Sequence, residues 1–483
     1  MARADSKESG DRSQESVAFV IRHPSFVIFP GMKLSTIAAT LAGLGTKPTQ
    51  SLGQNFLHDQ NIAKWIVGQA GITPGAPWVE IGPGLGALTE FAIEISPHGI
   101  LLEKDDRFAP WLRERFPTIE LVHGDALDFD TRELFWRGPI PVFGNLPYYV
   151  SSQLLFQFTA EPSPASRMVF TLQRELAERL CAKPDTSEYG ALTVLIGRRW
   201  NAKLVKHLPP QIFTPVPKVG SAVVLLTPRE DDTLPECDGV LFRELVKRGF
   251  SQRRKQLNKM LALARWPEFS EKLGVPMTAR AEDLSLAHWV TLTNLAADAP
   301  EDHSAGAQDV NGEVFDVVDD QNRVIDQKPR GVVHREKLLH RAIHIFVFNK
   351  CGELFLQRRS RWKDAHPRRW DSSAAGHVNA GDDYDTTAPR ELQEELGVTA
   401  PLELVGEISA CRNTGWEFVK IYRAEHNGPF HLPPAEIECG AFFTLDQIQR
   451  WMDARPKDFA NGFIECWRAL DSAGRLVRMT NDE

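Results

Sequence analysis

"VEIGPGLGALTE", residues 79–90, places three alternating glycines between an apolar strand pattern and a helical pattern. Glycines in such a turn let the backbone approach a ligand closely, and the amino end of the following helix favours an electronegative group. A glycine loop alone is equally compatible with a plain tight turn. The residues that follow the loop therefore decide its interpretation.

Acidic residues follow the next two apolar segments. "GILLE" ends in Glu103, at about the twenty-residue distance where a carboxylate accepts both hydroxyls of a ribose. "IELVHGDA" contains Asp125, which could accept from an exocyclic amine such as adenine N6. Together with Gly82 and Gly84 lining the ligand, this combination predicts S-adenosylmethionine rather than a dinucleotide.

Apolar runs alternate with more polar, helical patterns around this loop. They are "WVEI", "GILLE", "IELV", "PVFGN" and "RMVFTL". This rhythm predicts βαβ units and a parallel, Rossmann-like α/β sheet. Residues 241–297 have a helical pattern throughout, and an Ala-, Asp-, Gly- and Pro-rich linker follows. Beyond it, "AIHIFVFN" and "ELFLQRR" predict strands around a helical "APRELQEELG", as in an α+β domain.

"FGNLPYYV", residues 143–150, ends one of the predicted strands. Asn and Pro are common turn residues, so a turn is the simplest interpretation. Beside a methyl donor, the side-chain carbonyl of Asn145 and the backbone carbonyl of Pro147 could instead accept the N–H groups of an aromatic amine and localise its lone pair. Tyr148 could stack on the purine. This stretch therefore predicts methylation of adenine N6.

Several motifs in order resemble the bacterial 16S rRNA adenine dimethyltransferases over residues 32–297. They are "SLGQNFLHD", "VEIGPGLG", "GNLPYYVSS", "LQRELAERL", "EYGALTVL", "IFTPVPKVGSAVV" and "FSQRRKQLNKML". The resemblance implies that Asn55 and Leu57 close over the methionine end of the donor and that Asn145 faces both donor and target. It implies dimethylation of N6 of two adjacent adenosines near the 3′ end of 16S rRNA in the small ribosomal subunit. Thr49-Gln50 replaces a basic residue usual in relatives.

Two alternatives to rRNA methylation remain open. A DNA N6-adenine methyltransferase would share the Asn-Leu-Pro-Tyr signature, and a non-catalytic nucleic-acid-binding factor could share the fold. The intact donor motifs argue against the second alternative. The net charge of −8 argues against a protein that coats nucleic acid indiscriminately.

A basic stretch lies within residues 241–266. We expect its cations to contact RNA phosphates, the sequence-independent part of RNA affinity, although a solvated helix face is the usual alternative. The candidates are Arg243, Lys247, Arg248, Arg253, Arg254 and Lys255.

"GHVNAGDDYDTTAPRELQEELGV", beginning at Gly376, carries a second constellation. Glu391, Glu394 and Glu395 share one helical face, where hard oxygen ligands suit Mg²⁺ or Mn²⁺. Such an ion can bridge diphosphate oxygens and lower the pKa of an attacking water. The alternative is an exposed Glu-rich helix stabilised by Arg390.

This stretch resembles a Nudix box in which only the first Glu is altered, to Asp382. The resemblance spans about residues 312–470 and implies a Nudix α/β/α sandwich. The surrounding sequence is most similar to the subgroup near isopentenyl-diphosphate isomerase, but "WDSSAAGH" has Ser372 and Ser373 where that isomerase needs a cysteine. We therefore expect hydrolysis of a nucleoside diphosphate derivative rather than isomerisation, with Glu436 and Glu438 as candidates for an extra ligand or base.

Composition sets the remaining expectations. The six cysteines are scattered, and no histidine cluster has zinc spacing, so we expect reduced thiols in the cytoplasm with neither disulfides nor zinc. No apolar run approaches the roughly 18 residues that span a bilayer, so we expect no membrane partner. The expected domains are an N-terminal extension (1–31), a methyltransferase domain (32–229), a helical RNA-binding subdomain (230–297), a linker (298–311) and a Nudix domain (312–483). We expect the extension to be disordered and dispensable and Met32 to be the true start; the alternative is a short extension that begins at Met1 and packs on the catalytic domain.

Overall fold

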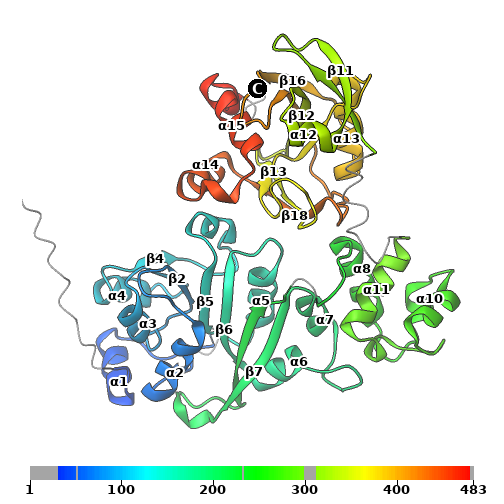
Figure 1. Ribbon diagram of the computed structural model, residues 1–483. Helices are drawn as coiled ribbons and strands as arrows, with labels where there is room; N and C mark the ends of the chain where they lie inside the picture. The colour runs from blue at the N-terminus through cyan, green and yellow to red at the C-terminus, as the bar shows by residue number, and fades with distance from the viewer. Residues whose placement is uncertain (1–30, 50–52, 231–232, 299–311, 479–483) are drawn as a thin grey trace, which may run out of the picture.

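A computed structural model describes residues 31–49, 53–230, 233–298 and 312–478 (Figure 1). The expectations for the N-terminal extension and for most of the linker therefore lie outside the described residues. Within the described ranges, no helix is long and apolar enough to cross a membrane.

The N-terminal half is built on a seven-stranded sheet with the order β4-β3-β2-β5-β6-β9-β7. The first five strands pair in parallel, which confirms the predicted βαβ sheet, while β9 and β7 add an antiparallel edge that was not predicted. The strands are β2 (Trp78–Ile81), β3 (Gly99–Glu103), β4 (Glu120–His123), β5 (Ile140–Asn145), β6 (Ala165–Gln173), β7 (Trp200–Leu208) and β9 (Ser221–Pro228). A small pair, β1 (Phe56–Leu57) and β8 (Phe213–Thr214), stands apart.

Helices cover both faces of this sheet because its central strands are apolar on both sides. Alternate strand residues enter different cores: Trp78 and Phe143 pack into one, and Val79 and Val142 into the other. The helical elements are α1 (Leu34–Gly43), α2 (Gln60–Ala70), α3 (Thr89–Ile95), α4 (Phe108–Arg115), α5 (Ser151–Thr159), α6 (Arg174–Leu180), α7 (Ala191–Gly197) and two short 3₁₀ segments, η2 (Thr131–Arg137) and η3 (Pro210–Ile212).

The helical pattern predicted over residues 241–297 forms as several short helices separated by turns. Its elements are α8 (Gly239–Phe250), α9 (Leu257–Leu261), α10 (Trp266–Leu273), η4 (Ala281–Asp283) and α11 (Leu286–Ala296). Residues 251–256 form a turn between α8 and α9. This segment, "SQRRKQ", offers no apolar side chain to bury against a neighbour, so packing does not sustain a helix there.

The C-terminal domain is a mixed sheet between helices, as predicted for an α+β sandwich. Its main order is β14-β13-β12-β17-β16, with β15 paired to β12 and β18 to β13. Helix α13 packs with one core, and α14 and α15 pack with the other. The strands are β10 (Val314–Val318), β11 (Val324–Pro329), β12 (His340–Phe348), β13 (Leu354–Arg359), β14 (Trp370–Asp371), β15 (Ala374–His377), β16 (Glu403–Ile408), β17 (Glu417–Glu425) and β18 (Ile437–Phe443). The helical elements are α12 (Arg330–Glu336), α13 (Tyr384–Leu396), α14 (Leu445–Ala454), η6 (Pro456–Asp458), α15 (Asn461–Ser472) and α16 (Arg475–Arg478).

Candidate functional site

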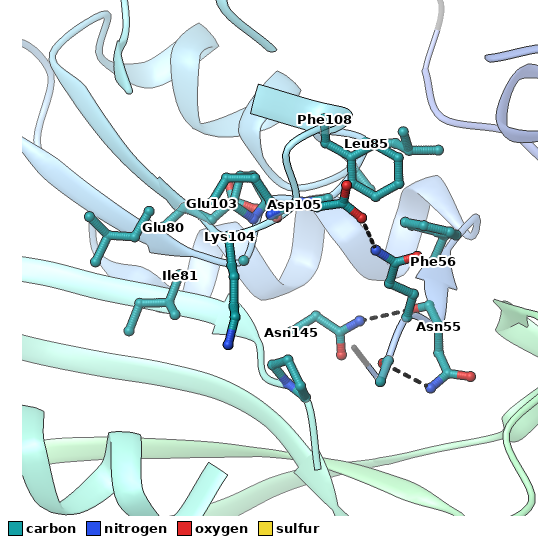
Figure 2. Close-up of a pocket in the computed structure, with 18 of the residues that line it drawn as sticks. Asn55, Phe56, Glu80, Ile81, Leu85, Glu103, Lys104, Asp105, Phe108 and Asn145 are labelled. Carbon is teal, nitrogen blue, oxygen red and sulfur yellow. Dashed lines mark hydrogen bonds between the residues drawn. The ribbon is translucent and has the colours of Figure 1, made fainter. Parts of the chain in front are cut away.

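The residues predicted to bind a methyl donor line one cavity at the carboxyl ends of the parallel strands (Figure 2). This clustering follows from the fold, because loops after neighbouring parallel strands meet at the same edge of a sheet. The predicted residues on the cavity wall are Asn55, Leu57, Gly82, Gly84, Glu103, Asp125, Asn145 and Pro147.

The glycine loop wraps closely around the cavity. Gly82 and Gly84 have φ angles of 65° and 56°, a region that side chains disfavour. A Cβ at Gly84 would lie 3.2 Å from the ring of Phe56, so the loop and the β1 segment approach each other through this glycine. Backbone atoms therefore form this wall of the cavity.

Glu103 is fixed by backbone donors on both of its oxygens. Its Oε2 accepts from the Gly84 N–H at 3.0 Å, and its Oε1 accepts from the Asp105 N–H at 2.8 Å. Burial raises the pKa of Glu103 to about 7. The carboxylate is thus held rigidly, with its remaining lone pairs available to hydroxyl donors from a ligand.

Asp125 lines the same cavity from the loop that follows β4. It pairs with Lys104, whose Nζ lies 2.5 Å from Asp125 Oδ2. Burial alone would raise the pKa of Asp125, but the bond to Lys104 and a backbone bond from Leu127 lower it. Lys104 also lines the cavity and was not predicted as a site residue.

A network of amides joins the segment before β1 to the end of β5. The Nδ2 of Asn145 donates to the backbone carbonyl of Asn55 at 2.9 Å, so its Oδ1 is left for another partner (Figure 2). Gln54 donates to Asp105 at 2.6 Å, and Asn55 donates to the Gly53 carbonyl at 3.2 Å. Gln54 and Asp105 were not predicted as contributors to this site.

The two tyrosines after Pro147 point to different surroundings. The hydroxyl of Tyr148 lies 2.6 Å from Ser221 Oγ on β9, and Tyr148 is not among the residues that line the cavity. Tyr149 does line it and is 54% exposed. The predicted stacking of Tyr148 on a purine stays a prediction, and Tyr149 is an additional aromatic at the mouth.

The basic residues predicted to contact RNA divide into two groups. Arg243, Lys247 and Arg248 on α8, and Arg254 and Lys255 in the following turn, are exposed. Arg253 is exposed too, but its guanidinium donates to Glu282 at 2.5 Å and to the carbonyl of Thr186 at 2.9 Å. Arg253 thus ties two loops of the protein together.

A second cavity, of about 1070 Å³, lies in the C-terminal domain and has the size of a nucleotide-type ligand site. Glu391, Glu394 and Glu395 all line it from α13. Arg390 pairs at 2.9 Å with both Glu391 and Glu394. These ion pairs are the ones expected for the alternative interpretation, a Glu-rich helix stabilised by Arg390. Burial, with repulsion from Glu395, raises the pKa of Glu391 to about 8, a repulsion that a cation would relieve.

Other polar residues complete this cavity wall. Glu395 accepts from Gln357 at 2.8 Å and from the Ala375 N–H at 3.1 Å. The half-buried Lys363 pairs with Glu436, and its Nζ lies 3.9 Å from Glu395. Glu438, the other predicted candidate, is not on the wall and lies 3.6 Å from Arg358.

Ser372 and Ser373 are fully buried structural residues. The Ser372 Oγ lies 2.6 Å from His344 Nδ1, and the Ser373 hydroxyl donates to the Phe355 carbonyl at 2.6 Å. Neither serine lines the cavity, so neither offers a nucleophile where an isomerase would need its cysteine.

Three side chains that line the second cavity, His334, His377 and Glu417, form a possible metal site with the buried His340, a group that sequence spacing did not predict. One ligand atom from each of His334, His340, His377 and Glu417 lies within 4.8 Å of all the others. His377 Nε2 is 3.1 Å from Glu417 Oε1, and His340 Nε2 is 3.6 Å from the same oxygen. Simple sequence spacing missed this group because its members come from separate segments of the chain.

The protonation pattern of this cluster suits a metal. His340 Nδ1 lies 2.9 Å from the Leu338 carbonyl, which can only accept, so Nδ1 carries the proton and Nε2 presents a lone pair. That Nε2 is buried without a hydrogen-bond partner. Burial lowers the pKa of His377 to about 4. A neutral imidazole and a carboxylate are ligating forms.

Comparison with known proteins gives two family matches. Residues 45–298 match the family described as ribosomal RNA adenine dimethylase, and residues 338–462 match the NUDIX domain. The chain is 42% identical over 255 residues to ribosomal RNA small subunit methyltransferase A of Brucella abortus biovar 1, covering 51% of this chain and 92% of that protein. The corresponding Bartonella tribocorum protein is 40% identical over 260 residues, covering 52% and 94%. The crystal structure of the 23S rRNA methyltransferase ErmE aligns at 25% identity with a TM-score of 0.42, covering 50% of this chain and 100% of that one.

Proposed function

Since this chain belongs to the ribosomal RNA adenine dimethylase family and carries a C-terminal Nudix domain, we propose that it dimethylates N6 of two adjacent adenosines near the 3′ end of 16S rRNA during small-subunit biogenesis. The observation that carries this proposal is the convergence of eight predicted residues on one cavity. Glu103 would accept the ribose hydroxyls of S-adenosylmethionine, and Asp125 its adenine amine. Asn55 and Leu57 would cover its methionine end.

S-adenosylmethionine supplies a methyl group on a positively charged sulfur. The protein's task is to aim the adenine amine at that group and to make its lone pair available. Asn145 Oδ1 accepts one N–H bond of the amine, which favours attack without a strong general base. The Pro147 carbonyl accepts from the Ser151 hydroxyl at 2.8 Å and from the Val150 N–H at 3.2 Å, so it would have to give up one of these bonds to accept the second N–H of the amine. Tyr148 stacks on the base, while Tyr149, exposed at the cavity mouth, contacts the flanking nucleotide.

RNA binding is assigned to the exposed cations of the helical subdomain, Arg248, Arg254 and Lys255. They would neutralise phosphates and bring a salt-dependent, sequence-independent affinity. Arg253 serves the same surface indirectly, because its bonds to Glu282 and Thr186 shape the turn that displays its neighbours.

The methyltransferase proposal is tested with small-subunit particles purified from a strain that lacks the modification. Full-length protein and labelled S-adenosylmethionine should yield dimethyladenosine at two adjacent positions, identified by digestion and mass spectrometry. Duplex DNA containing adenine serves as the competing substrate. Methylation of the DNA at a comparable kcat/KM would overturn the rRNA assignment in favour of the DNA alternative.

For the Nudix domain we propose metal-dependent hydrolysis of a nucleoside diphosphate derivative. Glu391, Glu394 and Glu395 are the proposed ligands of Mg²⁺ or Mn²⁺, which would supply charge neutralisation at a diphosphate and an acidified water. Arg359 and Lys363, which line the same cavity, would contact phosphate oxygens. The histidine cluster offers imidazole ligands that suit a transition metal better than Mg²⁺.

A panel of nucleoside diphosphate derivatives, with isopentenyl diphosphate included, tests this proposal on the full chain. Hydrolysis should require a divalent ion and should disappear in a Glu394→Gln/Glu395→Gln variant that still methylates rRNA. Conversion of isopentenyl diphosphate without phosphate release would instead establish isomerase chemistry.

A further inference from the structure

The Nudix domain is seated directly on the methyltransferase domain through η2 (Figure 1). Neighbouring η2 side chains point in opposite directions: Leu134 is buried in the methyltransferase core, whereas Phe135 enters the Nudix core. The Phe135 ring centroid lies 4.8 Å from that of Trp451 and 5.5 Å from that of Phe443. Aromatic contacts at these distances are those of a packed protein interior.

A polar rim surrounds this aromatic contact. Gln447, the third residue of α14, is 5% exposed, and its Nε2 donates at 2.9 Å to both Asp130 and Glu133. Arg450, one turn later, donates to the other Glu133 oxygen at 2.8 Å. From the methyltransferase side, Arg132 donates to the Phe442 carbonyl at 2.7 Å and pairs with Glu353 at 2.9 Å; both partners belong to the Nudix domain.

Hydrogen bonds fix the backbone of the residues between the donor cavity and η2. Asp125 Oδ1 accepts from the Leu127 N–H at 3.0 Å, and the Asp125 carbonyl accepts from the Asp128 N–H at 3.0 Å. Gln157 on α5 donates to the carbonyls of Ala126 and Phe129, at 3.0 and 2.8 Å. The next residue, Asp130, caps η2 and accepts from Gln447. The Nudix domain thus holds one end of a braced segment whose other end is Asp125.

The contact between the two domains covers neither cavity. Residues on the wall of the donor cavity all precede Pro164, and those on the wall of the second cavity all follow Gly312. A separate contact, between His431 and the α8 cap Asp238 at 2.9 Å, fixes the Nudix domain against the helical subdomain as well. The Nudix domain can therefore brace the donor site without blocking it.

We propose that the Nudix domain is a structural part of the methyl-donor site, with Gln447 and Arg450 as positioning residues that hold the segment from Asp125 to η2 in its donor-binding geometry. This inference rests on the proposed function, because it takes the first cavity to bind S-adenosylmethionine. It gives the fusion a role that is independent of what the Nudix cavity hydrolyses.

The test uses full-length protein carrying Gln447→Ala with Arg450→Ala, and Lys457→Ala, an exposed residue just beyond α14, as the matched control. The double variant should weaken donor binding about fivefold by calorimetry and raise the KM for the donor equally, because hydrogen bonds to charged groups are lost. Its kcat at saturating donor should not change, and Lys457→Ala should match the parent chain. Hydrogen exchange at residues 125–137 should speed up only in the double variant.

A charge exchange keeps the inference testable if the double variant folds poorly. Arg450→Glu should weaken donor binding through repulsion by Glu133, and adding Glu133→Arg should restore it. Unchanged donor affinity in the Gln447→Ala/Arg450→Ala variant would overturn the inference. Equal donor affinity in Arg450→Glu and in Arg450→Glu/Glu133→Arg would overturn it too. A parent chain that binds no S-adenosylmethionine would instead overturn the proposed function on which the inference rests.

Discussion

Replacing Asn145 by alanine should damage methyl transfer far more than donor binding, because its two polar atoms have different partners. The Nδ2 donates to the Asn55 carbonyl at 2.9 Å, which ties the closing segment to β5. Losing this bond removes about 1 kcal/mol, so donor affinity should fall about fivefold. The Oδ1 is the proposed acceptor for the target amine, and losing a preorganised group of this kind lowers kcat by about 10²- to 10³-fold.

Single-turnover transfer of labelled methyl groups to unmodified small-subunit particles measures the second effect, and calorimetry with the donor measures the first. Asn201→Ala, on the exposed face of β7, is the matched control and should leave both values unchanged. Asn145→Asp keeps the acceptor oxygen but places an anionic oxygen beside the Asn55 carbonyl. This variant should therefore have a higher kcat than Asn145→Ala but a lower donor affinity than Asn145→Ala. An Asn145→Ala enzyme with kcat near that of the parent would refute the assigned role.

Other predictions address the remaining parts of the two sites. Arg254→Ala with Lys255→Ala should weaken RNA binding and flatten the slope of log affinity against log salt by about two, one per phosphate contact. An unchanged slope would show that these residues do not contact RNA phosphates. The pKa of Glu103 is raised to about 7 by burial, and its ionised form accepts from the ribose, so donor affinity should be full above that pH and decline as the pH falls through it. Calorimetry across this range checks the sign, and a constant Kd would contradict it. His340→Ala with His377→Ala should remove a bound transition metal that elemental analysis detects in the parent chain, whereas equal metal content would exclude the cluster as its site.

The clustering of the proposed donor-binding residues could be predicted from the sequence because its determinants are local. Gly82, Gly84, Glu103, Asp125 and Asn145 each lie at or just after the end of a strand that its own apolar run identifies, and the parallel arrangement then brings those ends together. The same reasoning could not find Gln54 and Asp105, which meet only after the segment before β1 folds back over the sheet.

The histidine cluster shows where sequence reasoning fails and why. His340 lies opposite Glu417 in the parallel β12–β17 pair, and Ala342 lies opposite His377 in the antiparallel β12–β15 pair. The registers of these two pairings bring His340, His377 and Glu417 together, and sequence spacing does not encode a register. Likewise, nothing local distinguishes Arg253 from Arg254, although the fold commits the first of them to Glu282.

Leu134 and Phe135 pack into the cores of different domains, so they are buried at different times during synthesis of the chain. Leu134 can be buried as soon as the first sheet forms, but the partners of Phe135 lie on β18 and α14. Trp451 is translated about 300 residues after Phe135, which at about 5–20 residues per second takes about 15–60 s. During that interval a ribosome carries a folded first half with an uncovered aromatic surface. Nascent chains arrested after about residue 300 should therefore recruit a hydrophobic-surface chaperone, and chains with Phe135→Ser should recruit less of it.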